Sequence, residues 1–94
     1  MSGAWLEVDL GEIKPVDGVG MVFYSGRERI YRFDIWVSDD GINYRILYEG
    51  NSIGADGWEY LRINQNARYI RYVGYGHSVG EWNNICEFRP CIKK

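Results

Sequence analysis

Histidine, cysteine and proline are scarce in this sequence, and their scarcity limits its chemistry. The 94 residues include one histidine, two cysteines and two prolines. A single histidine excludes sites in which several imidazoles bind a metal, and any catalytic triad would have to use His77. Cys86 and Cys91 would lie roughly 16 Å apart in an extended strand, so they could form a disulfide only if Pro90 marked a sharp turn. We expect two free thiols and no metal site.

The sequence also lacks an excess of charge of one sign and any long apolar run. The net charge is −2 and the isoelectric point is about 5.3. This balance provides no basic face of the kind that nucleic acid requires, so nucleic acid is not expected as a partner. No apolar run approaches the roughly 18–20 residues of a membrane span, and the start, MSGAWLEVDLG, has neither the basic nor the apolar region of a signal peptide. We therefore expect no membrane span, and the cellular location stays unknown.

Aromatic residues are plentiful at 16%, and they occur in alternating patterns that are typical of strands. The alternation covers the ranges 5–10, 16–24, 30–38, 44–48, 58–63, 67–73 and 84–89. Turn signals separate these ranges at Gly11, 38–41 and 64–66, and Pro90 is expected to end the last strand. Short strands between turns predict an all-β, antiparallel sandwich or barrel that forms a single domain over residues 1–94. Most strand aromatics are expected to pack in the core or across strands.

Two glycines interrupt the strand predicted at 16–24. Gly18 and Gly20 alternate with the apolar residues Val19 and Met21. Glycine inside a strand weakens it, and it is commonly found where the strand bulges or where a neighbour approaches closely. The pattern predicts one of these two features.

The segment 38–43 resembles a calcium-binding loop in composition only. Asp39, Asp40 and Asn43 surround Gly41, but no glutamate follows at the spacing of an EF-hand. Aspartate, asparagine and glycine also suit a tight turn between two strands. We expect a turn here.

The stretch 67–84 is the most informative for function. A predicted strand leads into a glycine-rich loop that holds an aromatic, imidazole and amide set: Tyr75, His77, Trp82, Asn83 and Asn84. Flat aromatic rings pack on the C–H faces of sugars, and amide and imidazole groups hydrogen-bond to sugar hydroxyls. The loop therefore predicts a shallow site for a polar, ring-shaped ligand. A structural alternative stays open, in which Trp82 closes the end of the sandwich and the asparagines make turn hydrogen bonds.

Three segments together resemble the discoidin domain, which is also called the coagulation-factor type C or F5/8 type C domain. They are WLEVDLG at 5–11, YRFDIWVSDDGINY at 31–44 and ARYIRYVGYGHSVGEWNNICEF at 67–88, in the order of the family. The resemblance implies a galactose-binding-like jelly roll and non-catalytic binding of carbohydrate, such as a polysaccharide or a galactose- or uronate-type sugar. It also suggests an extracellular or periplasmic parent protein.

The same resemblance directs attention to the loop 24–29. In sugar-binding members an arginine near this position grips ligand hydroxyls, which makes Arg27 the first candidate and Arg29 the second, beside Tyr24. Arginine also matches the carboxylate of an acidic sugar with two parallel hydrogen bonds. The alternative is a solvated hairpin in which these arginines pair with Glu28 or Asp34.

One departure from the family concerns the region before the first strand. Members usually carry a further segment there, which supplies a structural calcium site in many of them and part of the sugar site. We expect no cofactor here, and calcium stays open. The sandwich would be shortened or completed by a second chain, because a missing strand exposes a sheet edge. The alternative to carbohydrate binding is therefore a protein-interaction or oligomerisation module, for which a homodimer is one arrangement.

An enzyme is not expected. No serine lies in a recognisable nucleophile motif, and neither does Cys86. No glycine-rich loop opens a helix, so nucleotide binding is also not expected.

Overall fold

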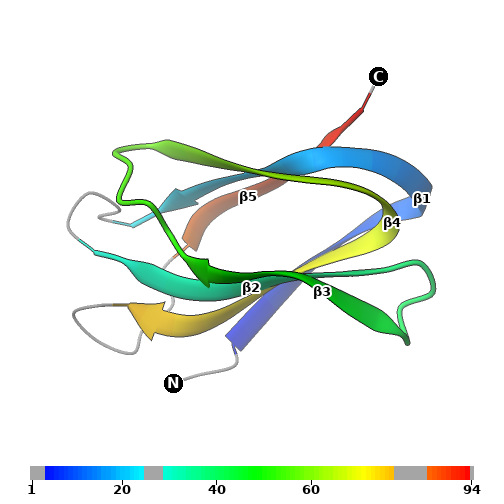
Figure 1. Ribbon diagram of the computed structural model, residues 1–94, viewed down its shortest axis with the longest axis horizontal. Helices are drawn as coiled ribbons and strands as arrows, with labels where there is room; N and C mark the ends of the chain where they lie inside the picture. The colour runs from blue at the N-terminus through cyan, green and yellow to red at the C-terminus, as the bar shows by residue number, and fades with distance from the viewer. Residues whose placement is uncertain (1–3, 25–28, 78–84, 94) are drawn as a thin grey trace.

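Five strands account for most of the part of the chain that the computed structural model describes, residues 4–24, 29–77 and 85–93. They are β1 (Ala4–Phe23), β2 (Tyr31–Ser38), β3 (Tyr44–Asn51), β4 (Trp58–His77) and β5 (Ile85–Ile92). All pairings are antiparallel, and the strand order is β3-β2-β4-β1-β5 (Figure 1). The predicted all-β, antiparallel fold is confirmed. No helix in these ranges is long and apolar enough to cross a membrane.

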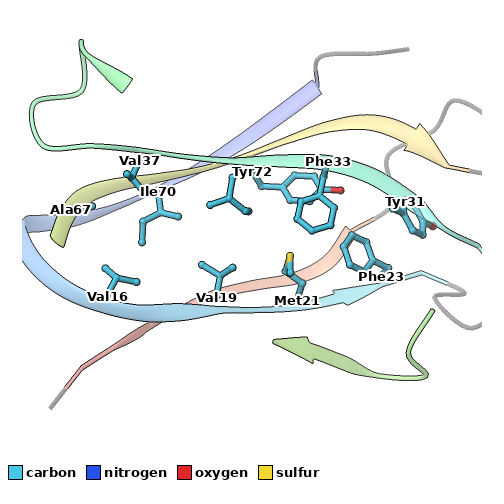
Figure 2. Close-up of a cluster of buried hydrophobic side chains, with 11 residues drawn as sticks. Val16, Val19, Met21, Phe23, Tyr31, Phe33, Val37, Ala67, Ile70 and Tyr72 are labelled. Carbon is cyan, nitrogen blue, oxygen red and sulfur yellow. The ribbon is translucent and has the colours of Figure 1, made fainter. Parts of the chain in front are cut away.

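The two long strands, β1 and β4, run through both layers of the sandwich. Residues 4–9 of β1 pair with 69–74 of β4, and residues 14–22 pair with 58–67, with register shifts between Asp9 and Lys14 and between Val16 and Gly18. Two residues near the irregularities, Gly11 (φ 87°) and Asn64 (φ 47°), have left-handed backbone conformations. Bulges of this kind bend a sheet. The single sheet therefore folds over on itself and forms two layers (Figures 1 and 2).

We call the two layers the β2 layer and the β5 layer. The β2 layer contains β3, β2, residues 67–77 of β4 and residues 4–9 of β1, and the β5 layer contains residues 58–66 of β4, residues 14–23 of β1, and β5. The expectation of separate strands at 5–10 and 16–24, and at 58–63 and 67–73, was wrong. Gly11 and the segment 64–66 lie within continuous strands, because a bulge lets pairing resume beyond it.

Pro90 does not end the last strand, contrary to expectation. It lies opposite Val19 within β5, which continues to Ile92. The strand β5 is at the edge of the sheet, where a residue without an N–H donor can be accommodated.

The core lies between the two layers (Figure 2). Its buried side chains come from β1 (Val16, Val19, Met21, Phe23), β2 (Tyr31, Phe33, Ile35, Val37) and β4 (Ala67, Ile70, Tyr72). Aromatic rings meet both across and within the layers, since Phe23 of the β5 layer stacks on Tyr31 of the β2 layer with centroids 4.8 Å apart and Phe33 stacks on Tyr72 within the β2 layer at 5.3 Å. Burying one large apolar side chain stabilises a fold by about 1.5–3 kcal/mol, so this cluster supplies the main driving force.

The turn between β2 and β3 uses its aspartate as predicted. Oδ1 of Asp40 accepts hydrogen bonds from the backbone N–H groups of Ile42 and Asn43, both at 2.8 Å, and Oδ2 accepts one from Nδ2 of Asn43 at 2.9 Å. These donors hold the pKa of the Asp40 carboxyl well below its usual range. The carboxylate is therefore occupied in fixing the turn, which confirms the turn prediction.

Candidate functional site

The strands that lead into the two predicted binding loops meet at one end of the sandwich. Phe23, near the end of β1, lies opposite Ile85 at the start of β5, and Tyr31 at the start of β2 lies opposite His77 at the end of β4. We call this region the loop end; it lies at the left of Figure 1. The structure thus brings together the strand ends that flank the two segments selected separately from the sequence.

Tyr31 holds the loop end in shape. Its backbone N–H donates to Oγ of Ser52 at 2.8 Å, and its backbone carbonyl accepts from the N–H of Ser52 at 2.7 Å. Its hydroxyl donates to the backbone carbonyl of Tyr24 at 2.6 Å. Tyr31 is fully buried, so Tyr24 is anchored to the core through its backbone while its own ring is 55% exposed.

Tyr24 and Arg29, both candidates from the sequence, are in contact. The guanidinium carbon of Arg29 lies 5.1 Å from the centroid of the Tyr24 ring. A cation at this distance over an aromatic face is attracted by the ring quadrupole. The stacking restricts the side chain of the arginine, and the N–H groups at the edge of its guanidinium can hydrogen-bond to a carboxylate. This pair can therefore present a fixed cation and an apolar ring face side by side.

Tyr75, the third described candidate, lies beside a different arginine. The guanidinium carbon of Arg32 is 6.0 Å from the Tyr75 ring centroid. The Tyr75 hydroxyl donates to Oδ2 of the buried Asp34 at 2.7 Å, and this hydrogen bond raises the pKa of Tyr75. Oδ2 of Asp34 also accepts from Nε1 of Trp36 at 3.2 Å. Tyr75 is thus held through its hydroxyl, and its ring rather than its hydroxyl is available to a ligand.

Arg32 was not among the site residues predicted from the sequence. It lies in the basic stretch 27–32, and no motif separates it from its neighbours. Only the pairing of β2 with β4 shows that it reaches Tyr75. Asp34, named in the alternative as a partner for Arg27 or Arg29, accepts hydrogen bonds from Tyr75 and Trp36. That alternative stays open, because Arg27 and Glu28 lie outside the described residues.

The remaining candidates fall outside the described residues. Arg27, Trp82, Asn83 and Asn84 lie in the segments 25–28 and 78–84. His77 ends β4, and its side chain is also outside the description. Their roles in binding stay predictions.

Two of the strand aromatics, Trp58 and Tyr60, pack across strands against Gly20 and Gly18 and yet remain half-exposed. Trp58 and Tyr60 project from the outer face of the β5 layer, where they are 53% and 50% exposed. Their alternation with Glu59 and Leu61 predicted a strand but could not show which of the two faces met the core. Cys91, on β5, is a free thiol, as predicted.

Within the described residues, no group of three or more histidine, cysteine, aspartate or glutamate side chains could hold a metal ion. The chemistry gathered at the loop end is therefore that of cations and aromatic rings. Such a set can bind and orient a polar ligand.

Comparison with known proteins identifies both a family and similar structures. A family model described as the F5/8 type C domain matches residues 1–88. The chain is 34% identical to the CBM32 module of AlyQ, solved in complex with 4,5-unsaturated mannuronic acid; the match covers 95% of this chain and 70% of that one, with a TM-score of 0.89. It is 30% identical to a pectin-binding carbohydrate-binding module over 100% of this chain and 69% of that one, with a TM-score of 0.86.

A longer structure extends this comparison. Truncated AlyQ with its CBM32 and alginate lyase domains is 32% identical over 99% of this chain but only 25% of its own, with a TM-score of 0.90. The chain therefore corresponds to one part of that protein. No protein with a curated description matches the chain.

Proposed function

The chain belongs to the F5/8 type C domain family, and we propose that it is a non-catalytic carbohydrate-binding module whose loop end binds an acidic sugar of the uronate class. The observation that carries the proposal is the presence of two arginine–tyrosine pairs, Arg29 with Tyr24 and Arg32 with Tyr75, close to the strand ends where Tyr31 pairs with His77. The two similar modules support it, since one was solved with an unsaturated mannuronic acid and the other binds pectin.

The chemistry of the pairs explains a preference for acidic sugars. A planar guanidinium can donate two parallel hydrogen bonds to a carboxylate. A charge-assisted hydrogen bond of this type is roughly twice as strong as a neutral one. The tyrosine ring provides a surface for the apolar C–H face of the pyranose. Tyr24 and Arg32 are exposed, so we expect one sugar to bury little area and to bind with modest affinity.

Titration with short sugars tests this proposal. Isothermal calorimetry of oligomannuronate, oligogalacturonate and a neutral cello-oligosaccharide should show binding of the acidic ligands only. Arg29→Ala and Arg32→Ala should each weaken that binding about tenfold, which corresponds to the loss of one charge-assisted contact worth about 1.5 kcal/mol. Mass spectrometry of the oligosaccharides after incubation should show no turnover.

Arg62→Ala is the matched control. Arg62 is an exposed arginine on the outer face of the β5 layer, and its nearest carboxylate oxygen, on Asp17, is 3.9 Å away. Its replacement should leave the affinity unchanged. If Arg29→Ala and Arg32→Ala bind the acidic sugars as well as Arg62→Ala does, the loop end is not the site.

A second candidate function, as a protein-interaction or oligomerisation module, is favoured by one open edge. Residues 4–9 of β1 pair with β4 on one side, and no described residue pairs with their other side. Leu6, Val8 and Leu10 in this region are only partly buried. An unpaired strand edge of this kind can accept another strand. A mass that rises with concentration in light scattering, without any response to sugars, would favour this function over the first.

A further inference from the structure

Trp58 and Tyr60 form an exposed aromatic strip on the outer face of the β5 layer, away from the core. The neighbours Glu59 and Leu61 turn to the other face, where Glu59 is buried. The two glycines of the sequence pattern lie on β1, next to these two aromatic residues. Gly20 pairs with Tyr60, and Gly18 pairs with Arg62.

The glycines allow the two rings to lie along the sheet. A Cβ atom at Gly20 would come within 3.2 Å of Cε3 and Cζ3 of Trp58, and one at Gly18 would come within 2.5 Å of the Tyr60 hydroxyl oxygen. Both glycines are buried although they are on the outer face, so the rings cover them. A ring that covers a glycine backbone on one side turns its other side to solvent. This is the close approach that the glycine pattern predicted as one of two alternatives.

A hydrogen bond fixes Tyr60, and a cation lies over the Trp58 ring. The Tyr60 hydroxyl donates to Oδ2 of Asp17 at 2.6 Å. The guanidinium carbon of Arg89, on β5, lies 5.4 Å from the Trp58 ring centroid. Together these side chains border a hollow of about 290 Å³, which Gly20, Trp58, Glu59, Tyr60, Arg89 and Cys91 line.

We propose that this hollow is a second saccharide-binding site, in which a pyranose ring of an acidic polysaccharide stacks on Trp58 and Tyr60 while Arg89 meets its carboxylate. The class of ligand rests on the proposed function, whereas the position of the site is argued from the β5 layer alone. Half-exposed rings that are fixed in the plane of a sheet offer the flat apolar surface that a sugar face requires. The Arg89 side chain is 68% exposed and its contact with Glu87 is long, at 3.4 Å, so its charge is available to an anionic ligand.

The two sites would act together on a long chain. The loop end lies where the strands finish, whereas the aromatic strip lies on the face of the β5 layer. A polysaccharide that contacts both sites gains avidity, since the second contact forms within the same complex. A short oligosaccharide fills each site independently, so the two sites can be measured separately.

Nuclear magnetic resonance with short oligomannuronate tests the strip directly. The four tryptophans give four indole N–H signals, and Trp58→Phe assigns the one from Trp58. That signal should shift on titration, and the shift should persist in Arg29→Ala, whose loop-end binding is impaired. If the Trp58 indole signal does not move at saturating oligosaccharide, the second site is overturned. That result would leave the proposed function intact, because the proposed function is tested separately by the loss of loop-end binding in Arg29→Ala.

Binding to long alginate tests whether the second site adds affinity for a polysaccharide. Trp58→Ala and Arg89→Ala should lower the apparent affinity for the polymer by about tenfold or more, with loop-end affinity for short oligosaccharides unchanged. The control is Ile46→Ala, which removes a half-exposed apolar side chain from β3, in the β2 layer, and should retain polymer binding. Unchanged polymer affinity in Trp58→Ala would contradict the proposal, and so would a change from dimer to monomer in sedimentation, because the strip would then be a contact between two copies of the chain.

Discussion

The guanidinium carbon of Arg71 lies 4.1 Å from the centroid of the Trp5 ring, so the first described segment of β1 is clamped to β4 by a cation on an indole. The same guanidinium lies 4.3 Å from the Tyr44 ring centroid, and its Nε is 3.1 Å from Oε1 of Glu7. Tyr44 completes the cluster by donating its hydroxyl to Oε1 of Glu7 at 2.6 Å. Side chains from β1, β3 and β4 thus converge on one arginine on the outer face of the β2 layer.

Replacement of Arg71 by methionine should destabilise the fold. The side chain of Arg71 is only 19% exposed, so the change removes its stacking on two rings and leaves the carboxylate of Glu7 without its cation. We expect a loss of about 2 kcal/mol in the free energy of unfolding, measured by urea denaturation. Arg62→Met is the control, because Arg62 is exposed and should change stability very little. Equal effects of the two substitutions would show that the cluster contributes nothing specific.

The contrast between the strand pattern and this cluster shows how far the sequence alone reaches. Alternation predicted where strands run because it depends on neighbours two residues apart, and the Asp40 turn could be predicted because its bonds are local. Glu7 and Arg71 are 64 residues apart, and nothing local marks them as partners. The passage of β1 and β4 from one layer to the other was missed for the same reason: a bulge and a turn have similar residues, and only the partner strand decides between them.

At the loop end, the sequence could supply candidate residues but not their pairing. Tyr24 and Arg29 belong to one short segment, so their contact was foreseeable. Arg32 and Tyr75 meet only because β2 pairs with β4. The outward orientation of Trp58 and Tyr60 could not be predicted, because alternation is the same whichever face meets the core.

Two buried tyrosines should respond in opposite ways to loss of the hydroxyl. Tyr31 donates to the carbonyl of Tyr24, whereas the Tyr72 hydroxyl has no hydrogen-bond partner among the described residues, and burial raises the pKa of Tyr72. Tyr31→Phe should cost about 1 kcal/mol of stability, while Tyr72→Phe should be neutral or stabilise by up to about 1 kcal/mol. Urea denaturation of both variants measures the difference. A clear loss of stability in Tyr72→Phe would show that its hydroxyl is satisfied in solution.

Alanine substitutions at the two glycines of β1 should differ in cost. A Cβ at Gly18 would lie 2.4 Å from the backbone oxygen of Leu61, which cannot move without shifting β4, whereas the nearest atoms to a Cβ at Gly20 are 3.2 Å away in the Trp58 ring. We expect Gly18→Ala to destabilise the fold by about 1–3 kcal/mol and Gly20→Ala by less, as judged by thermal unfolding. If Gly18→Ala proves as stable as the unsubstituted chain, the close approach of β4 to β1 is incorrect.

The hydrogen bond from Tyr60 to Asp17 predicts how stability changes in alkali. This bond raises the pKa of Tyr60 to about 12, above the ordinary value of 10.0, because it favours the neutral phenol beside a carboxylate. A group whose pKa is raised on folding contributes stability that is fully present below the unfolded value. That contribution should therefore be complete below about pH 10 and should be lost as the pH rises to about 12.

Ultraviolet titration of the phenolate band measures this ionisation. The difference between the unsubstituted chain and Tyr60→Phe isolates one tyrosine of eight, and its midpoint should lie near pH 12. Asp17→Asn should bring the midpoint down toward the ordinary value, since it removes the charged acceptor while keeping the shape of the side chain. The same variant should loosen Tyr60 over Gly18, so its binding of long alginate should weaken while the loop-end affinity for short oligosaccharides is retained. A midpoint near pH 10 in the unsubstituted chain would mean that Tyr60 is not held by Asp17, and the aromatic strip would then lack the rigidity on which sugar stacking depends.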